Sequence, residues 1–178
     1  TALASNSDRP AAVASRCAVS VVAWRDLARD VAAWDRLADE ASEPNPFFES
    51  WYLLPSFEAY DPRGDLRVLR FEHDGRLAGI LPLTRPAKYY GKPVPHLATW
   101  LHDNTFLGVP LVASGREVEF WHSALSWADR NAGAAMFLHL SDMSLDGSLF
   151  AALCAVLDVQ GRKGWIAQRQ DRAILSSD

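Results

Sequence analysis

Two apolar runs separated by Asp74-Gly75 constrain the fold of this 178-residue chain more than any other feature. Residues 66–73 and 76–83 are rich in apolar side chains, and an Asp-Gly pair between such runs is typical of a type I′ β-hairpin. Apolar residues on both faces of the ribbon indicate that both faces are covered, and Pro82 requires an edge position or a bulge. The loop length predicts three facing pairs: Phe71 with Ala78, Leu69 with Ile80, and Val68 with Leu81.

Segments with regular apolar spacing precede this hairpin. Residues 17–24 have the pattern of a strand, and apolar residues recur at helical spacing over 27–41. A second helix should end near Tyr60. Because proline fits only the first turn of a helix, Pro55 requires this helix either to begin near Leu54 or to kink.

Further elements are predicted after the hairpin. Residues 94–101 and Leu111-Val112 are apolar, strand-like runs, and Ser114-Gly115-Arg116-Glu117 has the pattern of a capping box that begins a helix ending near Ala128 or Asn131. The remaining predictions are a strand over 134–140, a helix over 145–157 and a final strand over 165–175. The order β-α-α-β-β-β-α-β-α-β predicts an α/β fold with one mixed sheet and helices on both faces.

Composition limits the partners and the compartment. A net charge of −4, a pI near 5.7 and the lack of long Lys/Arg runs argue against nucleic acid and against an anionic membrane surface. No apolar run approaches the roughly 20 residues that span a bilayer. Cys17 and Cys154 form no metal or redox motif, so we expect two small buried hydrophobes in a reducing, cytoplasmic compartment. Residues 1–16 should be a flexible tail, and residues 17–178 a single domain.

Four polar residues interrupt the apolar runs between 94 and 112, namely His102, Asp103, Asn104 and Thr105. Unpaired polar groups are costly inside a sheet, so these residues should lie at a strand break facing a cleft, or in a tight turn capped by Asp103 and Asn104. His102 with Asp103 is a candidate acid/base pair. Trp100, His102 and Asn104 are candidate substrate-binding residues.

Two other segments supply candidate site residues. Glu49 follows the link Asn45-Pro46-Phe47-Phe48 and could act as a general base if that link lines a cleft, or could cap the following helix. Tyr89 and Tyr90 lie in a proline-punctuated, basic loop over 84–95. This loop is either a lip that contacts substrate or an ordinary connection over the edge of the core. The histidines show no metal-ligand spacing, so no metal site is predicted.

Several motifs together resemble a known family. They are Trp34-x-x-Leu37, Asn45-Pro46-Phe47-Phe48, Gly79-Ile80-Leu81-Pro82-Leu83 and Asp103-x-x-Phe106-Leu107-Gly108-x-Pro110-Leu111. With the order of elements, they resemble the GNAT (acyl-CoA N-acyltransferase) fold. In particular, they resemble the N-terminal half of the acetyltransferase-like family linked to bacterial cellulose and exopolysaccharide synthesis, which is distantly related to Fem-type aminoacyltransferases.

The resemblance implies a function shared between two halves. A second GNAT-like half would follow residue 178, acetyl-CoA or another acyl-CoA would serve the full-length protein, and an amine, a saccharide or another small molecule would be the acceptor. This chain would contribute contacts to the acceptor. The alternative is a non-catalytic docking module of a polysaccharide-synthesis assembly.

The loop that holds the coenzyme in GNAT enzymes departs from its pattern here. Those enzymes carry an Arg/Gln-x-x-Gly-x-Gly/Ala loop before the helix that follows the fourth strand. Residues 110–119 occupy that place without the glycine pattern, and Glu117 and Glu119 put two carboxylates in the first helical turn. Because carboxylates compete with phosphate for a helix N-terminus, we expect no cofactor-binding residues in this chain.

Overall fold

The computed structural model describes residues 16–171, so nearly all of the expected N-terminal tail lies outside the described residues. The elements, in chain order, are β1 (Cys17–Ala23), α1 (Trp24–Leu27), the 3₁₀ turn η1 (Ala28–Asp30), α2 (Val31–Asp39), the 3₁₀ turn η2 (Pro46–Phe48), α3 (Ser50–Tyr60), β2 (Arg67–His73), β3 (Arg76–Thr84), β4 (Leu97–Thr99), β5 (Leu111–Val112), α4 (Glu117–Asn131), β6 (Leu138–His139) and α5 (Ser148–Val159).

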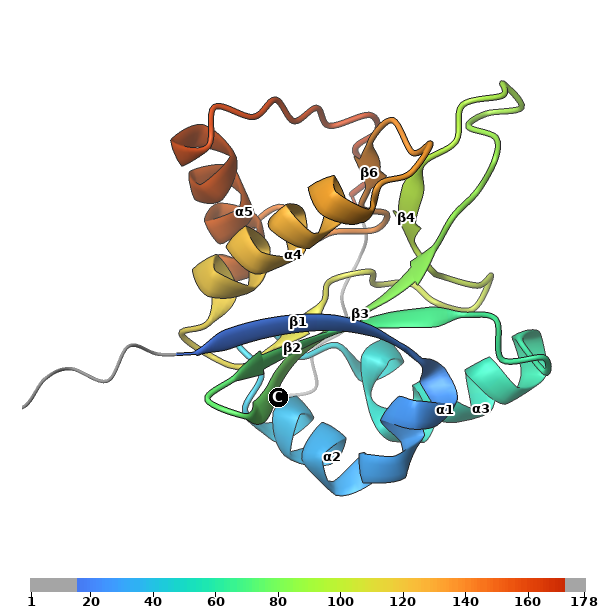
Figure 1. Ribbon diagram of the computed structural model, residues 1–178, viewed down its shortest axis with the longest axis vertical. Helices are drawn as coiled ribbons and strands as arrows, with labels where there is room; N and C mark the ends of the chain where they lie inside the picture. The colour runs from blue at the N-terminus through green and yellow to red at the C-terminus, as the bar shows by residue number, and fades with distance from the viewer. Residues whose placement is uncertain (1–15, 172–178) are drawn as a thin grey trace, which may run out of the picture.

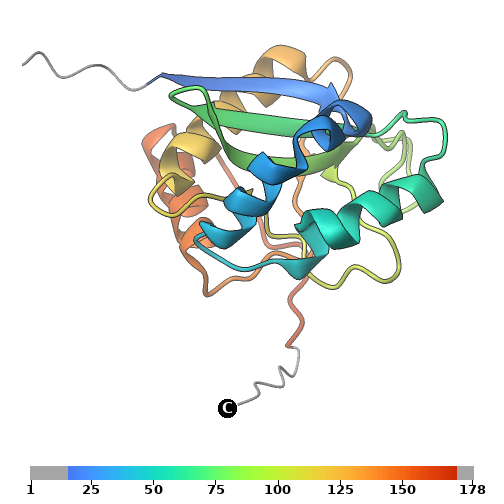
Figure 2. The same ribbon diagram turned by 90° about the horizontal axis from the view of Figure 1, so that it is seen from below.

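These strands form one mixed sheet in the order β1-β2-β3-β4-β6, with β5 also paired to β3. The pair β4–β6 is parallel and the other pairs are antiparallel. Helices α1, α2 and α3 cover one face of the sheet, and α4 and α5 cover the other (Figures 1 and 2). The predicted α/β fold with helices on both faces is therefore confirmed.

The hairpin β2–β3 forms around Asp74-Gly75 as predicted, but its register is not the predicted one. A bulge follows the turn, so Phe71 faces Gly79, Leu69 faces Leu81 and Val68 faces Pro82. Ala78 is the extra residue, and its carbonyl accepts a hydrogen bond from the N–H of Ala113 at 2.9 Å. The three predicted pairs are wrong because the sequence of the hairpin does not reveal this bond to a distant segment.

On the side of β3 away from β2, the neighbouring strand is interrupted and forms two short strands, β4 and β5. Both β4 and β5 run antiparallel to β3, with Thr99 facing Leu83 and Val112 facing Gly79, and residues 100–110 leave the sheet between them. Pro82 lies opposite this break, where its carbonyl accepts from the N–H of Trp100 at 2.9 Å. Since both backbone groups of a residue in an antiparallel ladder face the same neighbour, the N–H that proline lacks would point into the break. Pro82 thus lies in a central strand, at neither the predicted edge nor the bulge.

The first two helices also differ from their predicted bounds. The predicted helix over 27–41 is interrupted at η1, where Asp30 leaves the helical conformation (φ −130°) and its carboxylate caps α2 by accepting from Ala33 at 3.1 Å. Helix α3 begins at Ser50 and contains Pro55, so the predicted start near Leu54 is wrong.

The C-terminal third is less regular than predicted. The predicted strand over 134–140 is reduced to the two residues of β6, and the predicted helix over 145–157 is found as α5. Residues 165–171 form no strand, and the Trp165 side chain is 83% exposed. The predicted final strand is therefore absent over 165–171, and its remainder lies outside the described residues.

Buried tryptophans fix the helices around the sheet. The indole of Trp34 in α2 donates to the carbonyl of Phe48 at 2.9 Å, and the indole of Trp121 in α4 donates to the carbonyl of Leu149 in α5 at 2.8 Å. Both side chains are fully buried, which joins apolar burial to a satisfied polar group. None of the helices described in residues 16–171 has the length and apolar character needed to cross a bilayer.

Candidate functional site

Helix α3 and the segment 100–110 together form an aromatic cluster around His102. The imidazole stacks on Tyr60, with ring centroids 4.5 Å apart, and on Tyr52 at 5.9 Å, while Trp100 lies 5.6 Å away. Phe106, from the same segment, packs edge-on against Phe47 at 5.7 Å. The structure thus brings Trp100 and His102 next to α3, the helix that follows Glu49.

Both ring nitrogens of His102 are used within this cluster. The Ser56 hydroxyl donates to the carbonyl of Tyr52 at 2.8 Å, so His102 Nε2, which lies 3.1 Å from the Ser56 oxygen, must be the donor to it. Nδ1 then accepts from the N–H of Asn104 at 3.3 Å. Burial lowers the pKa of His102, and the neighbouring Asp103 only partly opposes this. The ring is a neutral group that positions the turn.

The polar junction adopts a tight turn. Asp103 and Asn104 are its exposed central residues, and the N–H of Thr105 donates to the carbonyl of His102 at 2.8 Å. The Tyr52 hydroxyl donates to the carbonyl of Asn104 at 2.6 Å, which fastens the turn to α3. A strand break and a tight turn therefore coincide at this place, but the hydrogen bonds described for the turn include no side-chain cap from Asp103 or Asn104.

The surface formed by residues 44–60 and 100–110 carries carboxylates and exposed aromatic rings. Residues 44–60 and 100–110 contain three carboxylates (Glu49, Glu58 and Asp103) and no Lys or Arg. Glu49 precedes α3, and its carboxylate accepts from the Trp51 indole at 2.6 Å rather than capping the helix. Three exposed rings occur in the same two segments: Trp51 (64% exposed), Tyr60 (55%) and Phe106 (59%).

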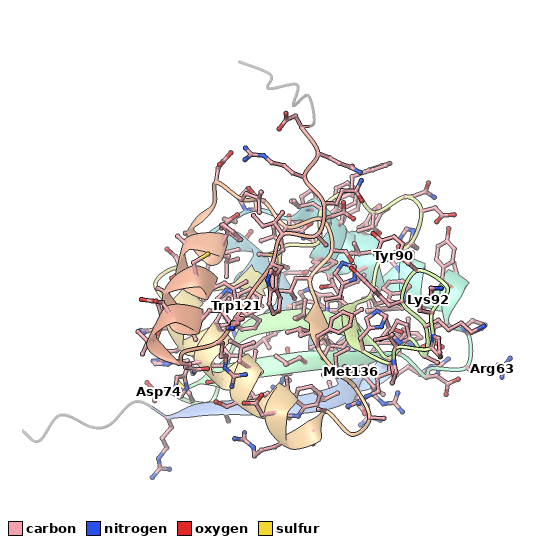
Figure 3. The ribbon with its side chains drawn as sticks, turned by 90° about the horizontal axis from the view of Figure 1, so that it is seen from above. Arg63, Asp74, Tyr90, Lys92, Trp121 and Met136 are labelled. Atoms are coloured by element: carbon pink, nitrogen blue, oxygen red, sulfur yellow. The ribbon has the colours of Figure 1, made fainter. Side chains whose placement is uncertain are left out.

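Tyr89 and Tyr90 lie in a different group of rings. Tyr89 and Lys92 exchange two backbone hydrogen bonds around a tight turn in which Tyr90 has φ +46° (Figure 3). The Tyr89 ring packs edge-on against His96, Phe137 and His139, at centroid distances of 5.0 to 5.3 Å. Among the described residues, their ring contacts do not reach His102, so these two predicted residues are separate from the aromatic cluster.

A groove of about 460 Å³ adjoins the aromatic cluster through Tyr60 and Trp100. Its other lining residues come from β1, the loop after α3, the starts of β2 and β4, the end of β3 with the residue that follows it, and α4, and they include Arg67, Arg85 and Trp127. Arg85 donates to the carbonyls of Asn131 and Ala132 at the end of α4. Only Trp100 among the predicted site residues lines this groove, because its walls come from segments far apart in the sequence.

Asp61 forms one wall of the groove and is itself buried. Its carboxylate accepts from the N–H groups of Leu66 (2.7 Å) and Asp65 (3.0 Å) and from the indole of Trp24 (3.0 Å). Burial alone would raise the pKa of Asp61, but these hydrogen bonds together lower it below its usual value. The ionised carboxylate therefore organises the loop between α3 and β2.

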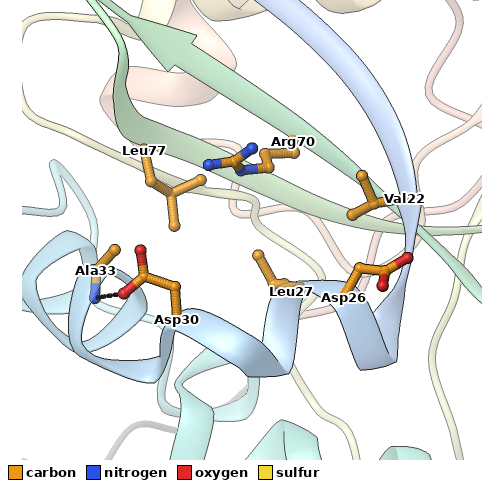
Figure 4. Close-up of a pocket in the computed structure, with 7 residues that line it drawn as sticks. All are labelled: Val22, Asp26, Leu27, Asp30, Ala33, Arg70 and Leu77. Carbon is orange, nitrogen blue, oxygen red and sulfur yellow. Dashed lines mark hydrogen bonds between the residues drawn. The ribbon is translucent and has the colours of Figure 1, made fainter.

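A second, smaller cavity of about 130 Å³ lies between the sheet and the helices α1 and α2 (Figure 4). Asp30, whose carboxylate caps α2, Asp26 and Arg70 line it together with apolar side chains. Small-molecule sites usually have volumes of about 300–1,000 Å³, so the larger groove is the better candidate for a ligand.

The loop before α4 has no free backbone amides in its four residues. The N–H of Ala113 donates to Ala78, that of Ser114 to Glu40, and that of Arg116 back to Ala113, at 2.9 to 3.0 Å. The N–H of Gly115 donates to the Glu117 carboxylate at 3.1 Å. Ser114 does not cap the helix as predicted. Arg116 is the residue before α4, and neither half of the predicted capping box forms, because the Glu117 carboxylate accepts from Gly115 while the N–H of Ser114 donates to Glu40.

The cysteines and potential metal ligands require one correction. Cys17 and Cys154 are free and exposed, so the expectation of two buried hydrophobes is wrong. Within residues 16–171, no three His, Cys, Asp or Glu side chains gather in a way that could hold a metal ion.

Comparisons with solved structures identify the fold. An aminoglycoside acetyltransferase from an uncultured soil metagenomic sample superposes with a TM-score of 0.52 and 13% identity, over 91% of this chain and 99% of that one. A GNAT family acetyltransferase from Staphylococcus aureus is similar at 0.46 and 10% identity, over 90% and 98% of the two chains. An aminoglycoside N-acetyltransferase solved in complex with CoA is similar at 0.46 and 13% identity, over 92% and 95%.

No protein-family model matches the sequence, and no curated protein matches it significantly. The chain thus has a GNAT-like acetyltransferase fold, and at these identities the similarity concerns the fold alone.

Proposed function

We propose that this chain is an acyltransferase-like domain that binds the acceptor of an N-acyl transfer reaction and does not itself hold the acyl-CoA. A second GNAT-like half, following residue 178, would supply the donor site. The motif resemblance described above supports the further proposal that the acceptor belongs to polysaccharide or cell-envelope synthesis. The GNAT-like fold supports the acyltransferase class, and the residues of the chain support the division of roles.

One observation carries this proposal, namely the occupied amides before α4. Phosphates bind at a helix N-terminus through unpaired N–H groups and the helix dipole. The N–H groups of residues 113–116 all donate within the protein, and Glu117 and Glu119 place negative charge in the first turn of α4. A pyrophosphate bound to the N–H groups of residues 113–116 would have to break their four hydrogen bonds and approach two carboxylates.

The surface formed by residues 44–60 and 100–110, which we call the acceptor face, suits a protonated amine. Exposed aromatic rings attract organic cations through their π faces, and carboxylates pair with ammonium groups. Trp51 and Tyr60 offer such rings, and Glu49 and Asp103 offer carboxylates. In this proposal the carboxylates of Glu49 and Asp103 attract the ammonium group, and a carboxylate can take its proton. His102 is a positioning residue, because both of its nitrogens bond within the cluster.

Calorimetry with acetyl-CoA tests the donor part of the proposal. We expect no heat of binding to this chain at millimolar acetyl-CoA, and micromolar affinity would contradict the proposal. A GNAT enzyme known to bind acetyl-CoA serves as the positive control for the titration.

Glucosamine and N-acetylglucosamine form a matched pair of probes for the acceptor face, because only the first carries an ammonium group. We expect glucosamine to shift the indole resonance of Trp51 and the amides of residues 102–106 in NMR spectra, and N-acetylglucosamine to shift them less. The double variant Glu49→Gln, Asp103→Asn should remove the difference between the two sugars. Equal shifts with both sugars in the unmodified chain would rule out recognition of the charge.

The alternative function is a non-catalytic docking module of a polysaccharide-synthesis assembly. The full engagement of His102 favours it, since the candidate acid/base pair then has no free ring nitrogen. Turnover by the full-length protein separates the two functions. Loss of turnover in the Glu49→Gln, Asp103→Asn variant supports acceptor binding, and unchanged turnover supports docking.

A further inference from the structure

Cys17 and His73 face each other across the edge of the sheet, far from the aromatic cluster. They are partners in the antiparallel register of β1 and β2, and Cys17 Sγ lies 3.6 Å from His73 Nδ1. A thiol and an imidazole at this distance can share the thiol proton. Cys17 is exposed, so a small molecule can reach its sulfur.

Asp74 completes the arrangement on the other side of the ring. Its carboxylate Oδ2 lies 3.3 Å from His73 Nε2. The same carboxylate accepts from the N–H of Arg16 at 2.9 Å through Oδ1, and the Asp74 N–H donates to the carbonyl of Arg16 at 2.9 Å. With Nε2–H directed at Asp74, Nδ1 is left as the acceptor that faces the thiol.

The surroundings of Cys17 raise the pKa of its thiol. Burial raises the pKa of Cys17, the carboxylates Glu119 and Asp74 raise it further, and Arg116 only partly opposes them. Less thiolate therefore forms spontaneously, so a neighbouring group that takes the proton would speed a reaction at the sulfur. His73 is the group in position to do so.

Asp74 lies at the opposite side of the molecule from Tyr90 and Lys92 (Figure 3).

We propose that Cys17 is a modification site for low-molecular-weight disulfides such as oxidised glutathione, with His73 as its general base and Asp74 as the residue that positions the imidazole. The Cys17 thiol gives its proton to His73 Nδ1, and the sulfur attacks one sulfur of the disulfide. The disulfide bond of the small molecule breaks as the new mixed disulfide forms. The departing thiolate takes the proton back from the imidazolium, so the small molecule is reduced to its thiol while Cys17 is oxidised.

The second cysteine provides an internal control. Cys154 is also exposed, but it lies on α5 and has no histidine partner among its described contacts. On incubation of the chain with oxidised glutathione, we expect peptide mass mapping to show Cys17 modified at least about tenfold faster than Cys154, since general-base catalysis typically contributes about 10²–10⁴-fold. Rates measured at several buffer concentrations without imidazole, extrapolated to zero buffer, remove the contribution of an added base.

Three variants separate the base from a merely structural role. His73→Gln should slow the modification of Cys17 to the rate of Cys154, and leave Cys154 itself unchanged. His73→Ala should be slow as well and should recover its rate when free imidazole is added. Asp74→Asn keeps a residue that favours the same turn, and should give a smaller loss than either histidine variant. Melting temperatures of the variants confirm that each remains folded.

Two results would overturn the proposal. One is equal reactivity of Cys17 and Cys154 in the unmodified chain. The other is a folded His73→Gln variant whose Cys17 keeps the rate and the pH dependence of the original, since a structural histidine would leave both unaltered.

Discussion

The side-chain nitrogen of Asn45 donates to the carbonyl oxygen of Val109 over 2.6 Å, which ties the link before α3 to the end of segment 100–110. The same nitrogen reaches the carbonyl of Leu107 at 3.2 Å, and Oδ1 accepts from the N–H of Phe47 at 3.1 Å. Asn45 is fully buried. One amide thus joins the two segments that form the aromatic cluster.

Replacing this amide should destabilise the domain. Asn45→Asp removes the donor and sets a carboxylate against two carbonyl oxygens, so we expect a loss of about 1–3 kcal/mol or more in the free energy of unfolding. Urea unfolding monitored by tryptophan fluorescence measures it. Asn131→Ala, at the exposed end of α4, is the control and should stay within about 0.5 kcal/mol. Equal effects of the two variants would show that the Asn45 bonds do not hold the segments together.

Gly108 allows segment 100–110 to pass close to the loop after β6. A Cβ at this position would collide with the carbonyl oxygen of Ser141, and the Gly108 N–H donates to the carbonyl of Asp142 at 2.9 Å. Because the Ser141 carbonyl is backbone and its neighbour is tied to Gly108, Gly108→Ala should cost about 1–3 kcal/mol and should shift the amide resonances of 105–109. Gly164→Ala is the comparison, since its Cβ would meet only the end of the Leu157 side chain at 3.0 Å. A Gly108→Ala protein with unchanged stability would contradict the close approach.

The neutral state of His102 predicts how stability depends on pH. Burial lowers the pKa of His102, and burial followed by the nearby His96 lowers that of His139. Because the unfolded chain takes up these protons at about pH 6.5, before the folded chain does, stability should be full above that value and decline as the pH falls below it. Unfolding in urea between about pH 8 and 5 measures this decline.

Substitution identifies the groups responsible for that decline. In the double variant His102→Gln, His139→Gln the slope between about pH 6.5 and 5 should become flatter. An unchanged slope would assign the dependence to other groups. His122→Gln, on the partly exposed side of α4, serves as the matched control.

Asp61 should govern stability at lower pH. Its folded-state pKa lies below the unfolded value of about 3.9, so its contribution is present above that pH and is lost as the pH falls through the folded value. Asp61→Asn directs an amide at donors and should cost about 1–3 kcal/mol near neutral pH, with a shallower loss in acid. Asp65→Asn, at an exposed position, should change stability by less than about 0.5 kcal/mol. Circular dichroism during acid titration compares the two.

Local patterns predicted the elements of this fold better than their pairing. The Asp74-Gly75 turn depends on residues adjacent in sequence, so the hairpin was predictable, whereas the bulge at Ala78 depends on its bond to Ala113. The break between α1 and α2 left the apolar spacing intact, and only Asp30 marked it. The alternating pattern after residue 164 looked like a strand, yet over 165–171 it forms no ladder with the sheet.

The candidate site shows the same division. Trp100, His102 and Asn104 stood out because polar residues interrupt an apolar run, and the structure places them beside α3. The groove was not predictable, since Arg67, Trp127 and Tyr60 meet only in the folded chain. The carboxylate at Glu117 was visible in the sequence, but the bonds that occupy the amides of Ala113 and Ser114 come from distant strands and helices.

Because residues 100–110 leave the sheet beside β3, the register of the strands does not depend on the residues that form the aromatic cluster. Since β4 and β5 are each fixed to β3 on their own, the turn around Asp103 and Asn104 can change in length and sequence without sliding either pairing, while residues 107–109 stay held by Asn45 and by the close approach at Gly108. Substitutions in this turn can therefore change which molecule is recognised while the sheet keeps its geometry. We therefore expect related chains to differ in length most within the turn between β4 and β5.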